Sequence, residues 1–233
     1  MIEHVKVKDK DAGQIKAHDI LKKIVDKNTL LALSGGTSMD YKKMIVSPPL
    51  RQGFEGQADD IIPGAICVVD ERYGEPFHKD SNEKLLADAG IKEFADKHCI
   101  ESRKILCGKS FDETTKFYGD VISQLFKKFP KRVGVMGVGS NVHTAGVFHG
   151  SLAAKSADLV VGEEVDDKFP KRITLTIRAL GEFTNFVVMM FGQEKKDALK
   201  IMLDEGENDM QKYPAIFYRK DPVKSFVITD IVL

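Results

Sequence analysis

The sequence predicts an α/β fold, with a mostly parallel sheet and helices on both faces. Two observations support this prediction. Short apolar runs of strand length are bounded by glycine and polar residues, and they alternate with longer stretches of helical period. The chain has 233 residues, of which 42% are hydrophobic, and it contains no internal repeat. We therefore expect one domain over residues 1–233, large enough for a proper core.

Helices are expected where apolar residues recur with a period near 3.6. Ile15, Ile20, Leu21, Ile24 and Val25 mark one face of the first helix. The other expected helices cover residues 81–89, 112–128 and 193–203, the last following Gly192. In the third of these four helices Asp112 can act as the N-cap, and the inward positions are Phe117, Val121, Leu125 and Phe126.

Strands are expected at the short apolar runs between these helices. They cover residues 30–33, 65–69, 133–136, 173–177, 186–191 and 226–229. The stretch SPPLRQGFEGQ, which begins at Ser47, is rich in proline and glycine and is expected to be a loop. In such folds ligands bind beyond the carboxyl ends of the strands. The residues that follow each strand are therefore the candidates for a site.

Composition limits the classes of function. Thirty-five basic residues balance thirty-five acidic ones, so net charge gives no indication of nucleic acid or an anionic membrane as a partner. Three cysteines without metal-ligand spacing are expected to be free thiols in a reducing compartment. The first residues lack the apolar core of a signal peptide, and no run approaches a membrane span. We expect a cytoplasmic protein, and the composition gives no indication of its oligomeric state.

The first candidate segment is Ser34-Gly35-Gly36-Thr37-Ser38, directly after a predicted strand. Two glycines allow a sharp turn with close backbone approach, and the hydroxyls and a following helix N-terminus favour an anion. A phosphate cradle is one interpretation, and a tight turn with a serine cap is the other. No Gly-Lys-Ser/Thr follows, so the segment is not a Walker loop.

The second candidate segment is Asp70-Glu71-Arg72, after the next strand. Charged residues at the end of an apolar strand are costly unless they face a cleft. Asp70 or Glu71 can handle protons or orient a sugar hydroxyl, and Arg72 can bind a phosphate or carboxylate. A structural Asp–Arg pair explains the same residues equally well.

The third candidate is His143, which follows the turn Gly137-Val138-Gly139. The segment fails the dinucleotide fingerprint because Val142 stands at the third glycine. A histidine delivered to a cleft by a glycine loop can act as a general base, with an ordinary pKa near ~6.5. Arg172 and Lys195 add positive charge; each is a solvated surface group unless the Gly35-Gly36 turn binds phosphate.

Five segments, in order, resemble the motifs of 6-phosphogluconolactonases, within the wider glucosamine-6-phosphate isomerase/lactonase family. They are SGGTS, DERYGEPFHKDSN, GVGSNVHTAGVFHGS, RITLT and GQEKKDAL. The resemblance implies a modified Rossmann-like fold and hydrolysis of 6-phosphoglucono-δ-lactone in the pentose phosphate pathway, without a metal or another cofactor. It also implies His143 as the base, Gly35, Gly36 and Thr37 at the phosphate, positive charge from Arg72, Arg172 and Lys195, and Asp70 beside the sugar ring.

The chain departs from the family pattern around the histidine. Asn141 and Val142 replace an Asp-Gly pair, so a carboxylate beside His143 is lost, together with the easy positive φ of glycine. Thr37-Ser38-Met39 replaces Ser-Thr-Pro, and His149 replaces a proline. A glucosamine-6-phosphate deaminase is the first alternative, although Thr144 to Phe148 lacks the acidic residue which that activity uses. A sugar-phosphate-binding homologue without catalysis is the second.

Overall fold

A seven-stranded parallel sheet forms the centre of the molecule. The computed structural model describes residues 1–46, 60–166 and 168–233, and the predicted loop from Ser47 lies outside them. The strands follow the order β1-β10-β9-β6-β2-β3-β5, and every neighbouring pair is parallel. Their bounds are β1 Ile2–Lys6, β2 Thr29–Leu33, β3 Ala65–Val68, β5 Glu101–Arg103, β6 Lys131–Gly137, β9 Asn185–Met190 and β10 Lys224–Thr229. The predicted parallel α/β fold is confirmed.

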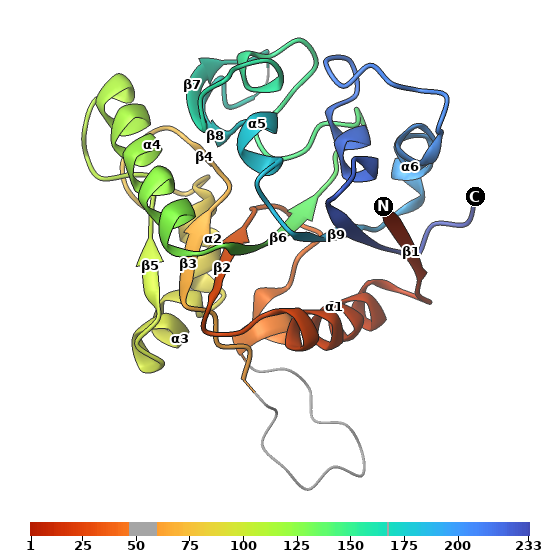
Figure 1. The fold of residues 1–233 in the computed structure, drawn as a ribbon, viewed down its shortest axis with the longest axis horizontal. Helices are drawn as coiled ribbons and strands as arrows, with labels where there is room; N and C mark the ends of the chain where they lie inside the picture. The colour runs from red at the N-terminus through yellow and green to blue at the C-terminus, as the bar shows by residue number, and fades with distance from the viewer. Residues whose placement is uncertain (47–59, 167) are drawn as a thin grey trace, which may run out of the picture.

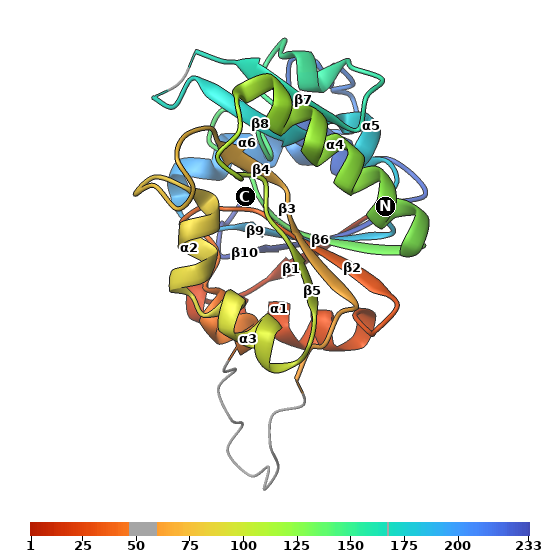
Figure 2. The same cartoon turned by 90° about the vertical axis from the view of Figure 1, so that its left-hand side faces the viewer.

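A second, antiparallel sheet of three strands lies beside the first (Figure 2). It consists of β4 Asp70–Arg72, β8 Lys171–Leu175 and β7 Val160–Glu164, in the order β4-β8-β7. Val69 joins the two sheets, because its N–H donates to Leu33 O at 3.0 Å and its carbonyl accepts from Leu175 N at 2.9 Å. The predicted strand at 173–177 therefore belongs to this small sheet, and it ends at Leu175.

Helices cover both faces of the parallel sheet. Figure 1 shows α1 below the sheet, with α4 and α5 above it, and Figure 2 places α3 on the same side as α1. The helices are α1 Lys10–Ile24, α2 Asn82–Asp88, α3 Ile91–Lys97, α4 Phe111–Lys128, α5 Ile177–Leu180 and α6 Lys196–Leu203. Short helical turns add Lys42–Val46, Leu152–Ala154, Gln193–Lys195 and Pro214–Arg219.

Several details of the predicted helices are wrong. Helix α4 is capped by Ser110, whose side chain accepts from Glu113 N in a capping box, so Asp112 lies inside its first turn. Phe117 is 38% exposed and Ile15 is 39% exposed, so neither side chain faces the core. The helix expected from 193 starts as a 3₁₀ turn and becomes α-helical only at Lys196.

The core is built on the buried central strands. All five residues of β2 are buried, as are Phe186 to Met190 of β9. Burial of such side chains stabilises the fold by roughly 1.5–3 kcal/mol each. The sheet therefore forms a rigid base, and the loops at its carboxyl edge carry the polar residues.

The three cysteines are free thiols, and the described residues include no helix long and apolar enough to cross a membrane.

Candidate active site

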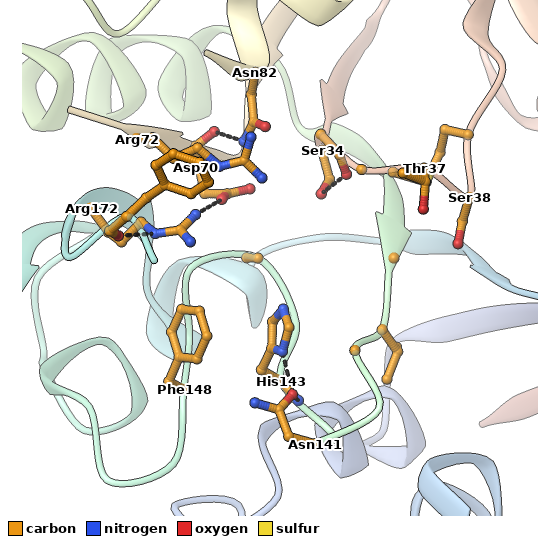
Figure 3. Close-up of a pocket in the computed structure, with 18 of the residues that line it drawn as sticks. Ser34, Thr37, Ser38, Asp70, Arg72, Asn82, Asn141, His143, Phe148 and Arg172 are labelled. Atoms are coloured by element: carbon orange, nitrogen blue, oxygen red, sulfur yellow. Dashed lines mark hydrogen bonds and ion pairs between the residues drawn. The ribbon is translucent and has the colours of Figure 1, made fainter. Parts of the chain in front are cut away.

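One cavity of about 390 Å³ lies at the carboxyl ends of β2, β3 and β6. Its lining includes every site residue predicted from the sequence, namely Ser34, Gly35, Gly36, Thr37, Asp70, Arg72, His143, Arg172 and Lys195. Figure 3 shows two facing walls, with Asp70, Arg72 and Arg172 on one side and Ser34, Thr37 and Ser38 on the other. The parallel topology brings together residues that are more than 150 positions apart in the chain.

The glycine turn is held from behind by hydrogen bonds. Tyr41 OH donates to Ser34 O at 2.6 Å, and Gln14 Nε2 donates to Ser38 O at 2.9 Å. Lys195 Nζ reaches Ser38 Oγ at 3.1 Å. The expected helix N-terminus at this turn is wrong, because the next helical turn, Lys42–Val46, begins several residues later. Positive charge at the turn therefore comes from side chains.

Two lysines supply that charge. Burial lowers the pKa of Lys195, and the nearby cation Lys10 lowers it further. Lys10 Nζ also donates to Thr37 O, on the outer side of the turn. Because two ammonium groups repel each other, a bound dianion at this turn would relieve an unfavourable interaction.

Asp70 and Glu71 have different surroundings, which separates their roles. Glu71 is fully buried and accepts from the backbone N–H groups of Arg72, Asn82 and Glu83 at 2.7–2.8 Å, so it fixes the start of α2. Asp70 instead lines the cavity, with Arg172 Nη1 at 3.9 Å. Burial raises the pKa of Asp70 to about 6, although the charge of Arg172 opposes the shift. Only Asp70 is placed to meet a ligand.

Arg72 and Arg172 lie directly opposite each other on β4 and β8. Like charges at facing positions destabilise a sheet unless other groups compensate. Phe169 supplies part of the compensation, because both guanidinium groups lie over its ring, at 5.0 and 5.9 Å from the centroid. Arg72 Nη1 also donates to Asp80 O, and Arg172 Nε donates to Phe169 O. The two arginines are thus held rigidly in one wall.

His143 sits on a tight loop that follows β6. Gly139 N donates to His143 O at 3.0 Å and Val142 N donates to Gly139 O at 3.0 Å, which closes the loop. Val142 has a φ of +65° and is 2% exposed. A β-branched residue in this region is strained, at a cost of roughly 1–2 kcal/mol. The loop therefore holds Val142 in a backbone conformation that glycine would adopt without strain.

Three neighbours hold the imidazole of His143. Its Nδ1 lies at hydrogen-bond distance from Asn141 Oδ1. The Phe148 ring stacks on it, with centroids 4.6 Å apart and planes inclined by 17°. A Cβ at Gly139 would come within 2.2 Å of His143 Cε1, so only glycine leaves room for the ring here. In Figure 3 the other ring nitrogen points into the space between the two walls.

Sequence reasoning assigned no role in the site to several cavity residues, among them Asn82, Phe148, Lys168 and Phe169. Asn82 and Phe148 lay inside recognised motifs, DERYGEPFHKDSN and GVGSNVHTAGVFHGS, but neither was named as a site residue. No sequence pattern indicated Phe169, because its contacts depend on the pairing of β4 with β8. Among the described residues, no group of three histidine, cysteine or acidic side chains is arranged to hold a metal ion.

Known proteins share this fold and parts of this sequence. A 6-phosphogluconolactonase from Xylella fastidiosa is 30% identical over 184 residues, which cover 74% of this chain and 71% of that protein. The crystal structure of a 6-phosphogluconolactonase from Shewanella baltica superposes with a TM-score of 0.76 at 18% identity, covering 100% of this chain and 97% of that one. A monomeric glucosamine-6-phosphate deaminase superposes with a TM-score of 0.74 at 14% identity, covering 98% and 96%. At such identities the structural matches establish the fold alone.

A family model extends the match to almost the whole chain. The model described as glucosamine-6-phosphate isomerases/6-phosphogluconolactonase matches residues 12–226. That range includes the glycine turn, both arginines, His143 and Lys195. The chain therefore belongs to the glucosamine-6-phosphate isomerase/6-phosphogluconolactonase family.

Proposed function

We propose that this protein hydrolyses 6-phosphoglucono-δ-lactone to 6-phosphogluconate. The relative from Xylella fastidiosa carries the name of that activity. The observation that carries the proposal is the orientation of His143, whose Nδ1 faces an oxygen and whose other nitrogen points into a cavity with cationic walls. A δ-lactone is an ester, so it needs an oriented water, a base and stabilisation of an oxyanion.

The substrate phosphate binds at the glycine turn. The backbone of Gly35 and Gly36, the hydroxyls of Thr37 and Ser38, and the Lys195 ammonium form that end of the cavity. In this pose Arg172 lies across the cavity beside Asp70 rather than at the phosphate (Figure 3). Its charge then acts near the sugar ring and on the ionisation of Asp70.

His143 acts as the general base. A proton on Nδ1 donates to Asn141 Oδ1, which leaves the lone pair on Nε2 for a water proton. The water oxygen attacks the carbonyl carbon while its proton passes to Nε2. The tetrahedral oxyanion then collapses, the bond to the ring oxygen breaks, and the same proton passes to that oxygen. Arg72, held in the opposite wall, faces the developing negative charge.

Asn141 preserves one part of the role of the missing carboxylate. In serine proteases, an Asp-to-Asn change beside the catalytic histidine lowers activity because the imidazole takes the wrong tautomer. Here the amide oxygen, not the amide nitrogen, faces Nδ1. The useful tautomer is therefore kept, whereas the electrostatic stabilisation of the imidazolium is lost.

A deaminase is the second candidate, since the fold is shared with a glucosamine-6-phosphate deaminase. The segment Thr144 to Phe148 supplies no carboxylate near His143. A pure sugar-phosphate binder is the third, and Asn141 is the observation that favours it. The lactonase retains all the groups that its chemistry needs, and it is therefore the preferred assignment.

Two activity assays and one measurement of 6-phosphogluconate binding separate these candidates. The purified protein is given fresh 6-phosphoglucono-δ-lactone, and hydrolysis is followed above the spontaneous background. A parallel sample receives glucosamine 6-phosphate, and ammonia release is measured. We expect hydrolysis and no ammonia. Ammonia release would support the deaminase, and tight 6-phosphogluconate binding without turnover would support the binder.

A further inference from the structure

Asn82 connects the two facing walls of the cavity. It is the first residue of α2 and is only 1% exposed. Its Nδ2 donates to the Asp70 carbonyl at 2.8 Å, and a Cβ at Gly35 would lie 1.9 Å from its Oδ1. Figure 3 shows the amide oxygen turned toward the Ser34 side of the cavity. The side chain is therefore fixed in place, with its oxygen directed toward the glycine turn.

Two buried polar atoms in this wall lack hydrogen-bond partners among the described residues. They are Asn82 Oδ1, an acceptor, and Arg72 Nε, a donor. Both residues line the same cavity. A buried polar group without a partner costs roughly 1–3 kcal/mol, and folded proteins contain few of them. Such a pair in a cavity wall is accounted for if a ligand supplies both partners.

We propose that Asn82 and Arg72 together bind a hydroxyl group of the sugar, the one next to the carbonyl carbon. A hydroxyl can donate to Asn82 Oδ1 and accept from Arg72 Nε at the same time, whereas a phosphate dianion or a carboxylate offers acceptors only. The position follows from the proposed function, on which this inference rests. The carbonyl carbon lies at His143, and the wall with Asp70 and Arg72 faces His143 across the cavity.

This arrangement makes Asn82 a specificity-determining residue. A sugar lactone without that hydroxyl would leave both buried atoms unpaired in the complex. Sites built to bind a substrate hydroxyl reject analogues that lack it far more strongly than apolar pockets reject a missing methylene. The Asp70 carboxylate, in the same wall, offers a second acceptor to the sugar and strengthens this preference.

The experiment compares 6-phosphoglucono-δ-lactone with its 2-deoxy analogue. For the wild-type protein we expect kcat/KM for the 2-deoxy lactone to be about 10–100-fold lower. In Asn82→Ala the parent lactone should lose a similar factor, so that the two substrates become nearly equal. Because the first comparison changes only the substrate, it tests the proposal even if the variant folds poorly.

Ser81→Ala is the matched control. Ser81 caps the same helix, since its Oγ accepts from Lys84 N at 3.1 Å and donates to Glu71 Oε2 at 2.9 Å. Ser81 is not among the residues that line the cavity. This variant should lower the melting temperature while it keeps the full preference for the parent lactone, which separates a disturbed helix start from a lost hydroxyl contact.

Equilibrium binding of 6-phosphogluconate and of its 2-deoxy analogue, measured by calorimetry, distinguishes this inference from the proposed activity. Hydrolysis of both lactones at equal rates would reject the hydroxyl contact and leave the lactonase standing. Discrimination in binding without hydrolysis would support the contact and reject the lactonase. If neither compound is bound or hydrolysed, both proposals are wrong.

Discussion

The side-chain oxygen of Asn141 faces Nδ1 of His143 and also accepts a hydrogen bond from the backbone nitrogen of His143, at 3.3 Å. One amide thus fixes both the ring and the loop that carries it. Replacement by leucine, which has a similar shape but no acceptor, removes the restraint on the tautomer. We expect Asn141→Leu to lower kcat by about 100-fold with a smaller change in KM.

Asn141→Asp is the matched variant, since it keeps the acceptor and restores a charge. A carboxylate beside the ring stabilises the imidazolium, so the acidic limb of the pH–rate profile should move to higher pH. Proton-detected NMR of labelled histidine reports the tautomer directly. An unchanged kcat in Asn141→Leu would contradict the role assigned to this pair.

Gly35 has no room for a side chain. A Cβ there would lie 1.9 Å from Asn82 Oδ1 and 2.2 Å from its Cγ, and Asn82 is held by its bond to the Asp70 carbonyl. We expect Gly35→Ala to push the turn and the amide apart and to lower kcat/KM by about 100-fold or more. Gly119→Ala in α4 is the control, because Gly119 does not line the cavity and its Cβ would meet Val160 Cβ at 3.9 Å, an ordinary contact. Comparable losses in both variants would contradict this account of the turn.

Glu83 makes stability depend on pH. The residue is 4% exposed, and burial raises the pKa of its carboxyl from 4.5 to about 7. Between these values the folded state keeps a proton that the unfolded chain has released, so stability is lost as pH rises toward 7. Glutamine has no such transition, and its oxygen can still accept from Leu106 N as Glu83 Oε1 does.

Glu83→Gln should therefore be more stable than wild type at pH 8, by about 1–3 kcal/mol, and nearly equal to it at pH 4.5. Urea unfolding at the two pH values measures the difference. Glu205→Gln, at an exposed position, controls for the loss of one negative charge. A gain in stability that is the same at both pH values would show that the Glu83 carboxyl does not titrate as described.

Alanine substitutions at two helical glycines are expected to change the stability of the protein in opposite directions. In α4 a Cβ at Gly119 would lie 3.9 Å from Val160 Cβ, so Gly119→Ala should stabilise the protein by about 0.5–1 kcal/mol through helix propensity. In α1 a Cβ at Gly13 would lie 2.3 Å from Phe191 Cζ, and Gly13→Ala should destabilise it. Thermal unfolding of the two variants, side by side, tests whether α1 packs as closely on the sheet as described.

Periodicity and turn chemistry predicted most of the parallel sheet, because its central strands are nearly continuous apolar runs. Strand β1, with the sequence IEHVK, was missed because it is an edge strand without a fully buried residue and is not a continuous apolar run. The small antiparallel sheet was also missed. Asp70 to Arg72 is polar, and its strand character arises from pairing with β8, which is a hundred residues away. Such pairing leaves no local signal.

The sequence predicts those site residues that stand out by their chemical type and by their position directly after a strand. His143, Asp70 and the glycine turn all follow central strands, and they meet in one cavity. The stack of Phe148 on His143 and the shared contacts of Phe169 depend on loop shape and on strand pairing. An aromatic residue in a loop has the same local signature whether it faces solvent or a histidine in a cavity, so these contacts required the structure.

The most direct test of the central claim is the rate of 6-phosphoglucono-δ-lactone hydrolysis, above background, by wild type and His143→Ala in parallel. Circular dichroism and 6-phosphogluconate binding establish that the variant remains folded with its phosphate site intact. We predict rapid hydrolysis by wild type and a loss of about 10²–10⁴-fold in the variant. Equal rates in the two folded proteins would show that His143 is not the base.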